Sequence, residues 1–304
     1  MKTPNFYTAT ALDRAGHRRR EPDWIAERLL HPETRFVAVW RGQNLVTSAN
    51  APGPEPVWLA REAVLAVESD PVLLGLKGEQ AYFALDLSSH EQPLQALTVE
   101  GAEFTDLRRV GPLLARDEGA LLAYARGIMH WHGRHRFCGL CGSPTRSEDA
   151  GHVRRCTNPD CNAQHFPRTD PAVIMPVTDG ERALLGRQKV WPRGQHSTLA
   201  GFVEPGESLE QAVAREVREE TGIVVDDVTY HSSQPWPFPA SIMLGFTARA
   251  VTTDISIDLD ELEGARWFEK AYIKGHADDE EFRLPRRDSI ARRLIEDWLG
   301  RPPA

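Results

Sequence analysis

The sequence predicts a chain of the α+β class with three parts. These are a mixed, mainly β N-terminal domain over residues 1–130, a four-cysteine ribbon over 131–168 and a C-terminal domain over 169–304. Three observations predict this division: strand-like runs dominate the first third, all four cysteines cluster in the middle, and the last third alternates buried strands with amphipathic helices. A length of 304 residues allows two domains with a small insert.

The overall composition is that of a soluble globular protein, with 41% hydrophobic and 26% charged residues. No apolar run approaches the length of a membrane span, and the segment 1–20 lacks the apolar core of a signal peptide. We therefore expect a cytoplasmic protein with no membrane partner. The net charge of -8 argues against nucleic-acid binding by the whole surface. Residues 126–168 are the exception, because they hold seven arginines, no lysine and three acidic residues.

The N-terminal domain is expected to contain a hairpin, a further strand and a long helix. Residues 35–46 form two short strands around Gly42, Gln43 and Asn44, and residues 81–88 alternate like another strand. A helix is predicted from Asp117 to about Arg134 by its apolar periodicity. Its expected buried face carries Leu121, Ala125, Ile128 and His132.

The cysteines form two close pairs, Cys138-x2-Cys141 and Cys156-x4-Cys161, separated by fourteen residues. Zinc takes four ligands in a tetrahedron, and each close pair suits a tight turn that presents two thiolates. We therefore predict one structural Zn²⁺ per chain, with no open position for catalysis. Four free cysteines are the alternative. Neighbouring histidines are less favoured as ligands, because the cysteines already complete the shell: His130, His132 and His135.

The C-terminal domain begins with a predicted hairpin, in which residues 173–177 and 183–185 flank a turn at Asp179-Gly180. Residues 223–230 and 242–251 have the composition of further strands. An amphipathic helix is expected over 288–299, capped by Asp288. These elements surround one acidic helix, which carries the chemistry.

The stretch from Gly201 to Ile223 combines a loop with that acidic helix. Ser208 and Gln211 have the spacing of a capping box, and Gly222 suits a left-handed C-terminal stop. The apolar residues recur at helical spacing and should face a core. They are Leu209, Ala212, Val213 and Val217.

Glu216, Glu219 and Glu220 share the other side of the helix. Like charges at this spacing destabilise a helix by about 0.2–0.5 kcal/mol per pair, so an offsetting positive charge is expected. Arg215 can neutralise one acid, and the others are hard oxygen ligands that suit Mg²⁺ or Mn²⁺ together with substrate phosphates. We expect Glu220 to be exposed. From the helix alone, a solvated acidic surface is the alternative.

A proline-rich segment, SQPWPFPASIM, follows at residues 233–243. Its prolines fix an extended backbone, on which Trp236 and Phe238 can present flat faces to a base or a nicotinamide ring. Aromatic side chains packed into the core are the alternative, and the chemistry of the segment leaves the two open.

The helix and its preceding loop match the Nudix box at every fixed position: Gly201, Glu207, Arg215-Glu216-Val217, Glu219-Glu220 and Gly222-Ile223. With the four cysteines and the segment SQPWPFP-x-S-x-M, the sequence resembles Nudix hydrolases of the bacterial NADH pyrophosphatase type. The resemblance is close from about residue 137 to 299 and holds only in layout before that. The x4 spacing of the second cysteine pair departs from the more usual x2 spacing of such pairs.

The resemblance implies a Nudix α/β/α sandwich, a homodimer with a composite site, and metal-dependent cleavage of NADH or NAD⁺ into nicotinamide mononucleotide and AMP. NAD-capped RNA contains the same bond and is a further implied substrate. The implied Mg²⁺ or Mn²⁺ ligands are Glu216, Glu219, Glu220, Glu261 and the backbone carbonyl of Ala200, with Glu219 either a ligand or the base. Arg215 and Glu207 are implied to organise the loop and helix.

The residues implied to contact the dinucleotide lie outside the box. They are Phe166, Phe202, Gln234, Pro235, Trp236, Pro237, Phe238, Pro239, Ala240, Ser241 and Ala291. Two rival functions stay open. One is a hydrolase of ADP-ribose or dinucleoside polyphosphates, and the other is a zinc-ribbon nucleic-acid-binding regulator whose Nudix domain senses a nucleotide. A degraded box would mark the regulator, and this box is intact.

Overall fold

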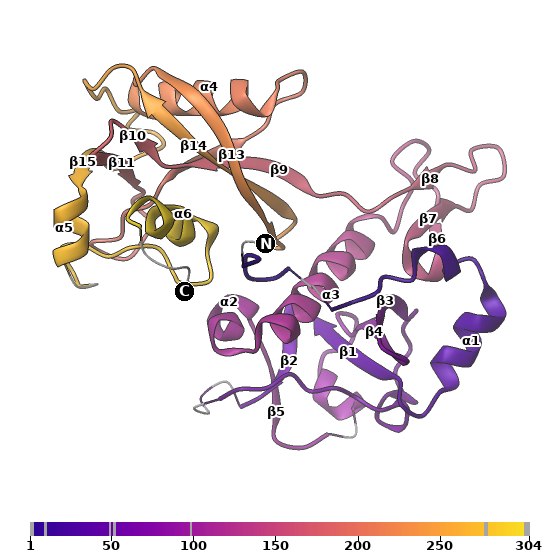
Figure 1. Cartoon of the computed structure of the whole chain (residues 1–304). Helices are drawn as coiled ribbons and strands as arrows, with labels where there is room; N and C mark the ends of the chain where they lie inside the picture. The colour runs from indigo at the N-terminus through magenta and orange to yellow at the C-terminus, as the bar shows by residue number, and fades with distance from the viewer. Residues whose placement is uncertain are drawn as a thin grey trace. The chain divides into compact units, whose positions relative to one another are not determined.

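The computed structural model describes residues 3–300 except 9, 10, 49, 51, 52, 98, 277 and 278. The chain divides into two compact units, drawn in Figure 1. We call Tyr7–Thr169 with Trp236–Ala240 the N-terminal unit. The C-terminal unit contains Met1–Phe6, Asp170–Pro235 and Ser241–Ala304. Among the described residues, no helix is long and apolar enough to cross a membrane.

The N-terminal unit is built on a five-stranded sheet of order β3-β4-β1-β2-β5. Its strands are β1 (Arg35–Trp40), β2 (Gln43–Thr47), β3 (Val72–Lys77), β4 (Gln80–Asp86) and β5 (Ala102–Thr105). Strand β1 is parallel to β4 and antiparallel to β2. The predicted hairpin and third strand are confirmed, but the turn consists of Arg41 and Gly42, which both have positive φ. Gln43 and Asn44 already belong to β2.

The predicted long helix is α3 (Arg116–Arg134), which contacts four strands of this sheet. All four residues of its predicted buried face are buried, so this prediction is confirmed. The unit also contains α1 (Pro22–Leu30), α2 (Leu107–Val110) and the short 3-10 turns η1 (Gly16–Arg18), η2 (Arg61–Val64), η3 (Pro93–Ala96), η4 (Gly111–Leu113) and η5 (Asp149–Gly151). Between the sheet and its covering segments lies a core that includes Phe36, Leu45 and Phe83.

A three-stranded ribbon follows α3 in the chain. Its strands are β6 (Thr145–Glu148), β7 (Val153–Cys156) and β8 (Gln164–His165), in that order and antiparallel. The ribbon has few apolar residues of its own, so its fold depends on other contacts. Two of these are buried hydrogen bonds from His132 to the carbonyl of Gly151 and from His152 to the carbonyl of Leu73.

The C-terminal unit contains a seven-stranded mixed sheet of order β12-β9-β14-β10-β11-β15, with β13 pairing β14. The strands are β9 (Asp170–Met175), β10 (Val177–Thr178), β11 (Arg182–Arg187), β12 (Leu199–Phe202), β13 (Val225–Trp236), β14 (Ser241–Ala250) and β15 (Gly264–Glu269). The first predicted strand is interrupted at Pro176, where a proline removes a backbone donor. Both of its parts, β9 and β10, pair in parallel with β14.

Helices cover both faces of this sheet, which confirms the α/β/α sandwich (Figure 1). Neighbouring residues of β9 point to opposite faces: Val173 packs beneath α4 (Leu209–Thr221), and Ile174 packs against α6 (Ile290–Trp298). Helix α5 (Lys270–Gly275) joins the second face. The predicted cap of the last helix is wrong. The side chain of Ser289 caps α6, whereas Asp288 is buried and pairs with Arg286.

Candidate active site

Helix α4 begins and ends as predicted. The Ser208 side chain accepts a hydrogen bond from the Gln211 backbone, and the Gln211 side chain accepts one from the Ser208 backbone. Gly222 has a φ of 73° at the C-terminal end. The predicted apolar face packs into the core between helix and sheet. This packing fixes the rotation of the helix about its axis, and therefore the direction in which its acidic side chains point.

Three carboxylates converge on that side. Glu216, Glu220 and Glu261 each offer an oxygen within 4.8 Å of the others. Glu219 lies outside this group and its side chain is 58% exposed. The expectation that Glu220 is exposed is wrong, because only 4% of its surface is accessible. Helical periodicity turns Glu220 toward the sheet, where the segment carrying Glu261 lies against it.

Glu220 has no positively charged partner in the part of the chain that the structure describes, whereas Glu216 contacts Arg215. Burial, and then the nearby Glu216 and Glu261, raise the pKa of Glu220 to about 8. Burial also raises the pKa of Glu216. One oxygen of Glu220 is buried without any hydrogen-bond partner. Buried charges are normally paired or bind a metal, and three clustered carboxylate oxygens are the ligands that Mg²⁺ and Mn²⁺ prefer. The donor set therefore fits a divalent cation.

Arg215 connects the loop to the helix. Its guanidinium binds both oxygens of Glu207 at 2.6 and 2.9 Å, and it also contacts Glu216 at 2.8 Å and Glu219 at 2.9 Å. A fifth hydrogen bond reaches the carbonyl of Phe202. Hydrogen bonds from Arg215 lower the pKa of Glu207 to about 2, so this carboxylate is charged at neutral pH. Arg215 is thus held in place, with its donors occupied by protein groups.

Gly201 is required by the position of Glu216. A methyl group added at Gly201 would lie 1.8 Å from the carboxyl carbon of Glu216, which is an impossible contact. The absence of a side chain at Gly201 on β12 therefore leaves the space that the Glu216 carboxylate occupies. This explains in physical terms why a glycine precedes the acidic helix.

The carboxylates line a cavity of about 690 Å³. Its wall also contains Ala200, exposed Phe202, Arg215 and Glu219. Sequence reasoning missed several lining residues that lie on loops and carry no motif: Gln188, Lys189, Val190, Glu204 and Leu259. Lys189 donates a hydrogen bond to the carbonyl of Leu259 at 3.4 Å, which links its loop to the segment that carries Glu261.

The proline-rich segment Trp236–Ala240 groups with the N-terminal unit. The Trp236 and Phe238 rings pack edge to face, 5.0 Å apart, and both contact Tyr7. The Arg126 guanidinium lies 4.9 Å from the Phe238 ring and donates to the carbonyl of Pro237 at 2.6 Å. Trp236 and Phe238 are half-buried, so each combines core-like packing with some accessible surface.

Other predicted substrate contacts are buried. Gln234 is 1% exposed, and its amide donates to the carbonyls of Phe6 and Asp288 while its oxygen accepts from the backbone of Ile290. Ala291 is 5% exposed, within the core beneath α6. Their roles toward substrate stay predictions. Phe166, in the N-terminal unit, is exposed, as are Pro235 and Pro239, whereas Pro237 is buried and Ala240 and Ser241 are half-buried.

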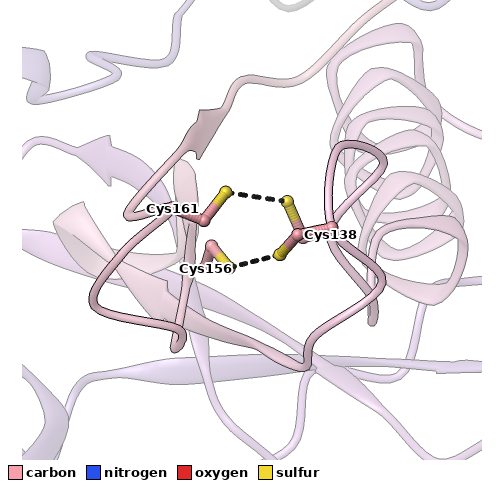
Figure 2. A group of neighbouring side chains, drawn as sticks. Cys138, Cys156 and Cys161 are labelled. Carbon is pink, nitrogen blue, oxygen red and sulfur yellow. Dashed lines mark hydrogen bonds between the residues drawn. The ribbon is translucent and has the colours of Figure 1, made fainter.

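The four cysteines come together as predicted, and all are free thiols. Figure 2 shows the sulfur atoms of Cys138 and Cys161 facing each other, 3.8 Å apart. The sulfurs of Cys141 and Cys156 are 3.4 Å apart. A tetrahedral zinc with bonds of about 2.3 Å would space its sulfurs by about 3.8 Å, so the cluster fits zinc.

The histidines near the ribbon do not complete this cluster. His132 is buried and bonded to Gly151, and His135 contacts the carbonyl of Trp131 at 2.9 Å. His130 lies on α3 and is not a member of the four-cysteine group. His165 approaches the Cys138 sulfur at 3.3 Å, which the sequence did not indicate. The four cysteines alone supply a complete tetrahedral set of zinc ligands, whereas the carboxylate cluster borders a cavity.

Three family models match the chain. A NUDIX domain matches residues 168–287, an NADH pyrophosphatase-like rudimentary NUDIX domain matches 33–131, and an NADH pyrophosphatase zinc ribbon domain matches 134–166. The last match, together with the sulfur geometry, supports a structural zinc. The rudimentary domain was not foreseen from the sequence, and the exact domain boundaries stay predictions.

Several relatives match almost the whole chain. Human NAD-capped RNA hydrolase NUDT12 is 36% identical, over 97% of this chain and 73% of that protein. NAD-capped RNA hydrolase NudC of Stutzerimonas stutzeri is 42% identical, over 86% and 88%. NudC of Mycobacterium bovis is 37% identical, over 99% and 96%.

Proposed function

The chain belongs to the Nudix hydrolases of the NADH pyrophosphatase type, and we propose that it cleaves the pyrophosphate bond of NADH or NAD⁺. The products are nicotinamide mononucleotide and AMP. The same cleavage at an RNA 5′ end removes an NAD cap. The observation that carries this proposal is the cluster of buried Glu216 and Glu220 with exposed Glu261 beside a cavity, with one Glu220 oxygen left unpartnered.

Glu216, Glu220 and Glu261 would hold Mg²⁺ or Mn²⁺, joined by the backbone carbonyl of Ala200. When bound, the divalent ion neutralises pyrophosphate oxygens and makes water a better nucleophile. The unpartnered oxygen of Glu220 and its raised pKa support this role, because a cation would supply the missing partner. Zinc, one ion per chain, would stay in the ribbon and take no part in the reaction.

Arg215 and Glu207 keep the loop and the helix in register. Arg215 donates hydrogen bonds to Glu207, Glu216, Glu219 and the Phe202 carbonyl, and it thereby orients the carboxylates. Glu219 is exposed and held by Arg215 at 2.9 Å, which supports a role as the base. In the reaction, the water oxygen bonds to one phosphorus and the bridging oxygen leaves with the other phosphate. One water proton passes to a carboxylate such as Glu219, and the other stays on the new phosphate.

The segment from Gln234 to Ser241, with Phe166, Phe202 and Ala291, is proposed to select the dinucleotide. Exposed Phe202 on the cavity wall supports this proposal, because an accessible ring can stack on a base. A homodimer and a cytoplasmic location remain predictions. Light scattering on the purified protein tests the dimer directly.

A substrate panel tests the function. NADH, NAD⁺, NAD-capped RNA, ADP-ribose and diadenosine polyphosphates are compared at equal concentration with Mg²⁺ or Mn²⁺. We expect the highest kcat/KM for the NAD-containing substrates and no turnover with a chelator. Preference for ADP-ribose or a dinucleoside polyphosphate would instead favour the rival hydrolase. Binding without turnover of any substrate would favour the nucleotide-sensing regulator.

A further inference from the structure

The N-terminal unit contains a second cavity, of about 390 Å³, between the β1–β2 turn and the C-terminal end of α3. Its volume lies within the range of about 300–1,000 Å³ that is usual for ligand pockets. Arg41 lies at the turn, Arg134 ends the helix and Arg136 follows it. Ser88 and Ser89 add hydroxyl groups to the wall. None of these residues has a role in the chemistry proposed above.

The three guanidinium groups are left without acidic partners. Within the part of the chain that the structure describes, no ion pair forms to Arg41, Arg134 or Arg136. By contrast, Arg18, Arg108, Arg146 and Arg155 in the same unit each bind a carboxylate at 2.6–2.9 Å. The Arg41 guanidinium instead lies 4.9 Å from the ring of Trp40, which leaves its hydrogen-bond donors available.

The carboxylate cavity and this second cavity have opposite charge. The carboxylate cavity is lined by six acidic residues and two basic ones, and the second cavity by three arginines and one acid, Asp86. Asp86 already accepts a hydrogen bond from the backbone of Ser88 at 2.9 Å. The carboxylate cavity therefore attracts cations, and the arginine cavity attracts anions. This positive site is notable in a chain whose net charge is -8.

We propose that the arginine cavity binds phosphodiester groups in the RNA body of a capped substrate. Guanidinium groups match phosphate oxygens in a bidentate geometry, and serine hydroxyls commonly donate to phosphates. The three arginines are exposed, so the ligand can continue beyond the cavity, as a strand does. Arg134 and Arg136 belong to the segment 126–168, which holds seven arginines and three acidic residues. The proposal rests on the proposed function only for the identity of the bound strand as NAD-capped RNA.

A solvated set of arginines is the rival interpretation. Arg134 ends α3, where a cation is favoured by the helix dipole without any ligand. The carbonyl end of the helix also opposes an anion, and the arginines must outweigh it. The two interpretations differ in a measurable way, because only a phosphate site makes RNA affinity depend on these particular arginines.

The experiment compares two double variants that each remove two positive charges. Arg134→Ala with Arg136→Ala removes part of the site, and Arg61→Ala with Arg287→Ala is the control elsewhere on the surface. KM and kcat are measured for NADH and for a short unstructured NAD-capped RNA. Binding of the same RNA with a 5′ monophosphate is measured by fluorescence anisotropy at several salt concentrations, with inorganic phosphate as a competitor.

For the site variant we expect KM for capped RNA to rise on the order of tenfold, with NADH kinetics unchanged. The slope of log affinity against log salt should become shallower by about 1.4, which is about 0.7 for each lost contact to a single strand. Equal RNA affinity and slope in the two double variants would overturn the proposal. Displacement of the RNA by low millimolar phosphate would also overturn it, in favour of a small-anion site. Failure of the wild type to cleave NADH would instead contradict the proposed function, and the anisotropy measurement would still test the cavity.

Discussion

The sheets of the two units have the same connectivity. In the N-terminal unit, β1 is parallel to β4, β2 pairs β5 and β3 lies outside β4. In the C-terminal unit, the β9–β10 strand is parallel to β14, β11 pairs β15 and β13 lies outside β14. The order along the chain is also the same, and each sheet is followed by a helix, α3 or α6, that contacts it. The match to a rudimentary NUDIX domain therefore has a structural basis.

The units differ between the hairpin and the next strand. The C-terminal unit inserts β12 and the thirteen-residue α4, which bring Gly201 and the acidic residues. At the corresponding place, the single helical element among the described residues of the N-terminal unit is the four-residue turn η2 (Arg61–Val64). The same sheet connectivity therefore occurs in both units, and the acidic helix α4 is found in the C-terminal unit. The sheet is therefore a common scaffold, and the inserted helix carries two of the three carboxylates that are proposed to bind the metal.

Two buried ionisable side chains, His132 and Glu220, differ in a similar way. In the N-terminal unit, His132 donates from Nε2 to Gly151 and its Nδ1 contacts Arg154 at 3.0 Å, so both nitrogens have partners. In the C-terminal unit, one oxygen of buried Glu220 has none. A buried ionisable group with all its partners stabilises a fold, whereas a buried carboxylate without one is suited to bind a cation. The following changes test whether structure and chemistry divide in this way.

The largest effect is expected from loss of the zinc cluster. Cys138→Ser should abolish the single bound zinc and lower the melting temperature strongly, because a structural zinc contributes about 10–16 kcal/mol of apparent binding free energy. The kcat and KM of protein that remains folded should be unchanged. Elemental analysis measures the zinc content and thermal unfolding measures the melting temperature, with Ser147→Ala in β6 as the control. An active, folded wild type without zinc would contradict the ribbon.

Glu220→Gln should affect chemistry and leave the fold intact. We expect kcat to fall by more than about 100-fold, or 2.7 kcal/mol, because a charged ligand for the divalent ion is lost. Stability provides a second readout. Because the carboxyl pKa is 4.5 in an ordinary glutamate and about 8 for Glu220 in the folded protein, the metal-free wild type should lose stability as pH rises from 4.5 through 8. The variant should not show this loss. Glu210→Gln, exposed on the same helix, is the control. Retention of a tenth of the activity would remove Glu220 from the metal site.

The buried histidines should make the N-terminal unit sensitive to acid. Burial lowers the pKa of His132 and of His152 from 6.5 to about 4, so the folded state holds both neutral. The unfolded chain binds more protons between these values, and stability is therefore lost as pH falls from about 6.5 toward 4. Each histidine should contribute about 2–3 kcal/mol to this loss. Denaturant unfolding with saturating zinc should show a flatter pH profile for His152→Gln, but not for exposed His17→Gln. Identical profiles would contradict the prediction.

Gly201→Ala tests the geometry of the C-terminal site without changing a charge. The new methyl group must displace the Glu216 carboxylate, so we expect kcat to fall by about tenfold or more, or 1.4 kcal/mol. Gly264→Ala is a matched control on β15, because a methyl group there meets nothing within 4 Å. Divalent-ion titration of both variants locates the cause. Unchanged affinity and kcat would mean that Glu216 can move freely.

Local patterns predicted the parts of this protein that depend on neighbouring residues. The capping box of α4 and the two cysteine turns lie within short segments, and both were predictable. The burial of Glu220 was not, because it depends on Glu261 and the sheet. Gln234 is fixed by Phe6 and Asp288, which are distant in sequence. The repeated fold escaped notice because the N-terminal copy has lost the helix that carries the motif, and sheet connectivity leaves no sequence signature of its own.

Trp236→Ala should have the smallest effect on the chemical step, because ring stacking acts in ground and transition states alike. Stacking contributes about 1–3 kcal/mol, so KM for NADH should rise about 5- to 150-fold while kcat is roughly kept. A small pyrophosphate substrate that lacks the second nucleoside should be affected much less. The half-buried Trp236 ring also packs against Phe238 and Tyr7, which gives the packing alternative a structural basis. Tyr230→Ala, an exposed aromatic residue on the same strand, is the control. Equal loss for both substrates would make Trp236 a packing residue, and the hydrolase assignment would stand, because it depends on α4 and its carboxylates.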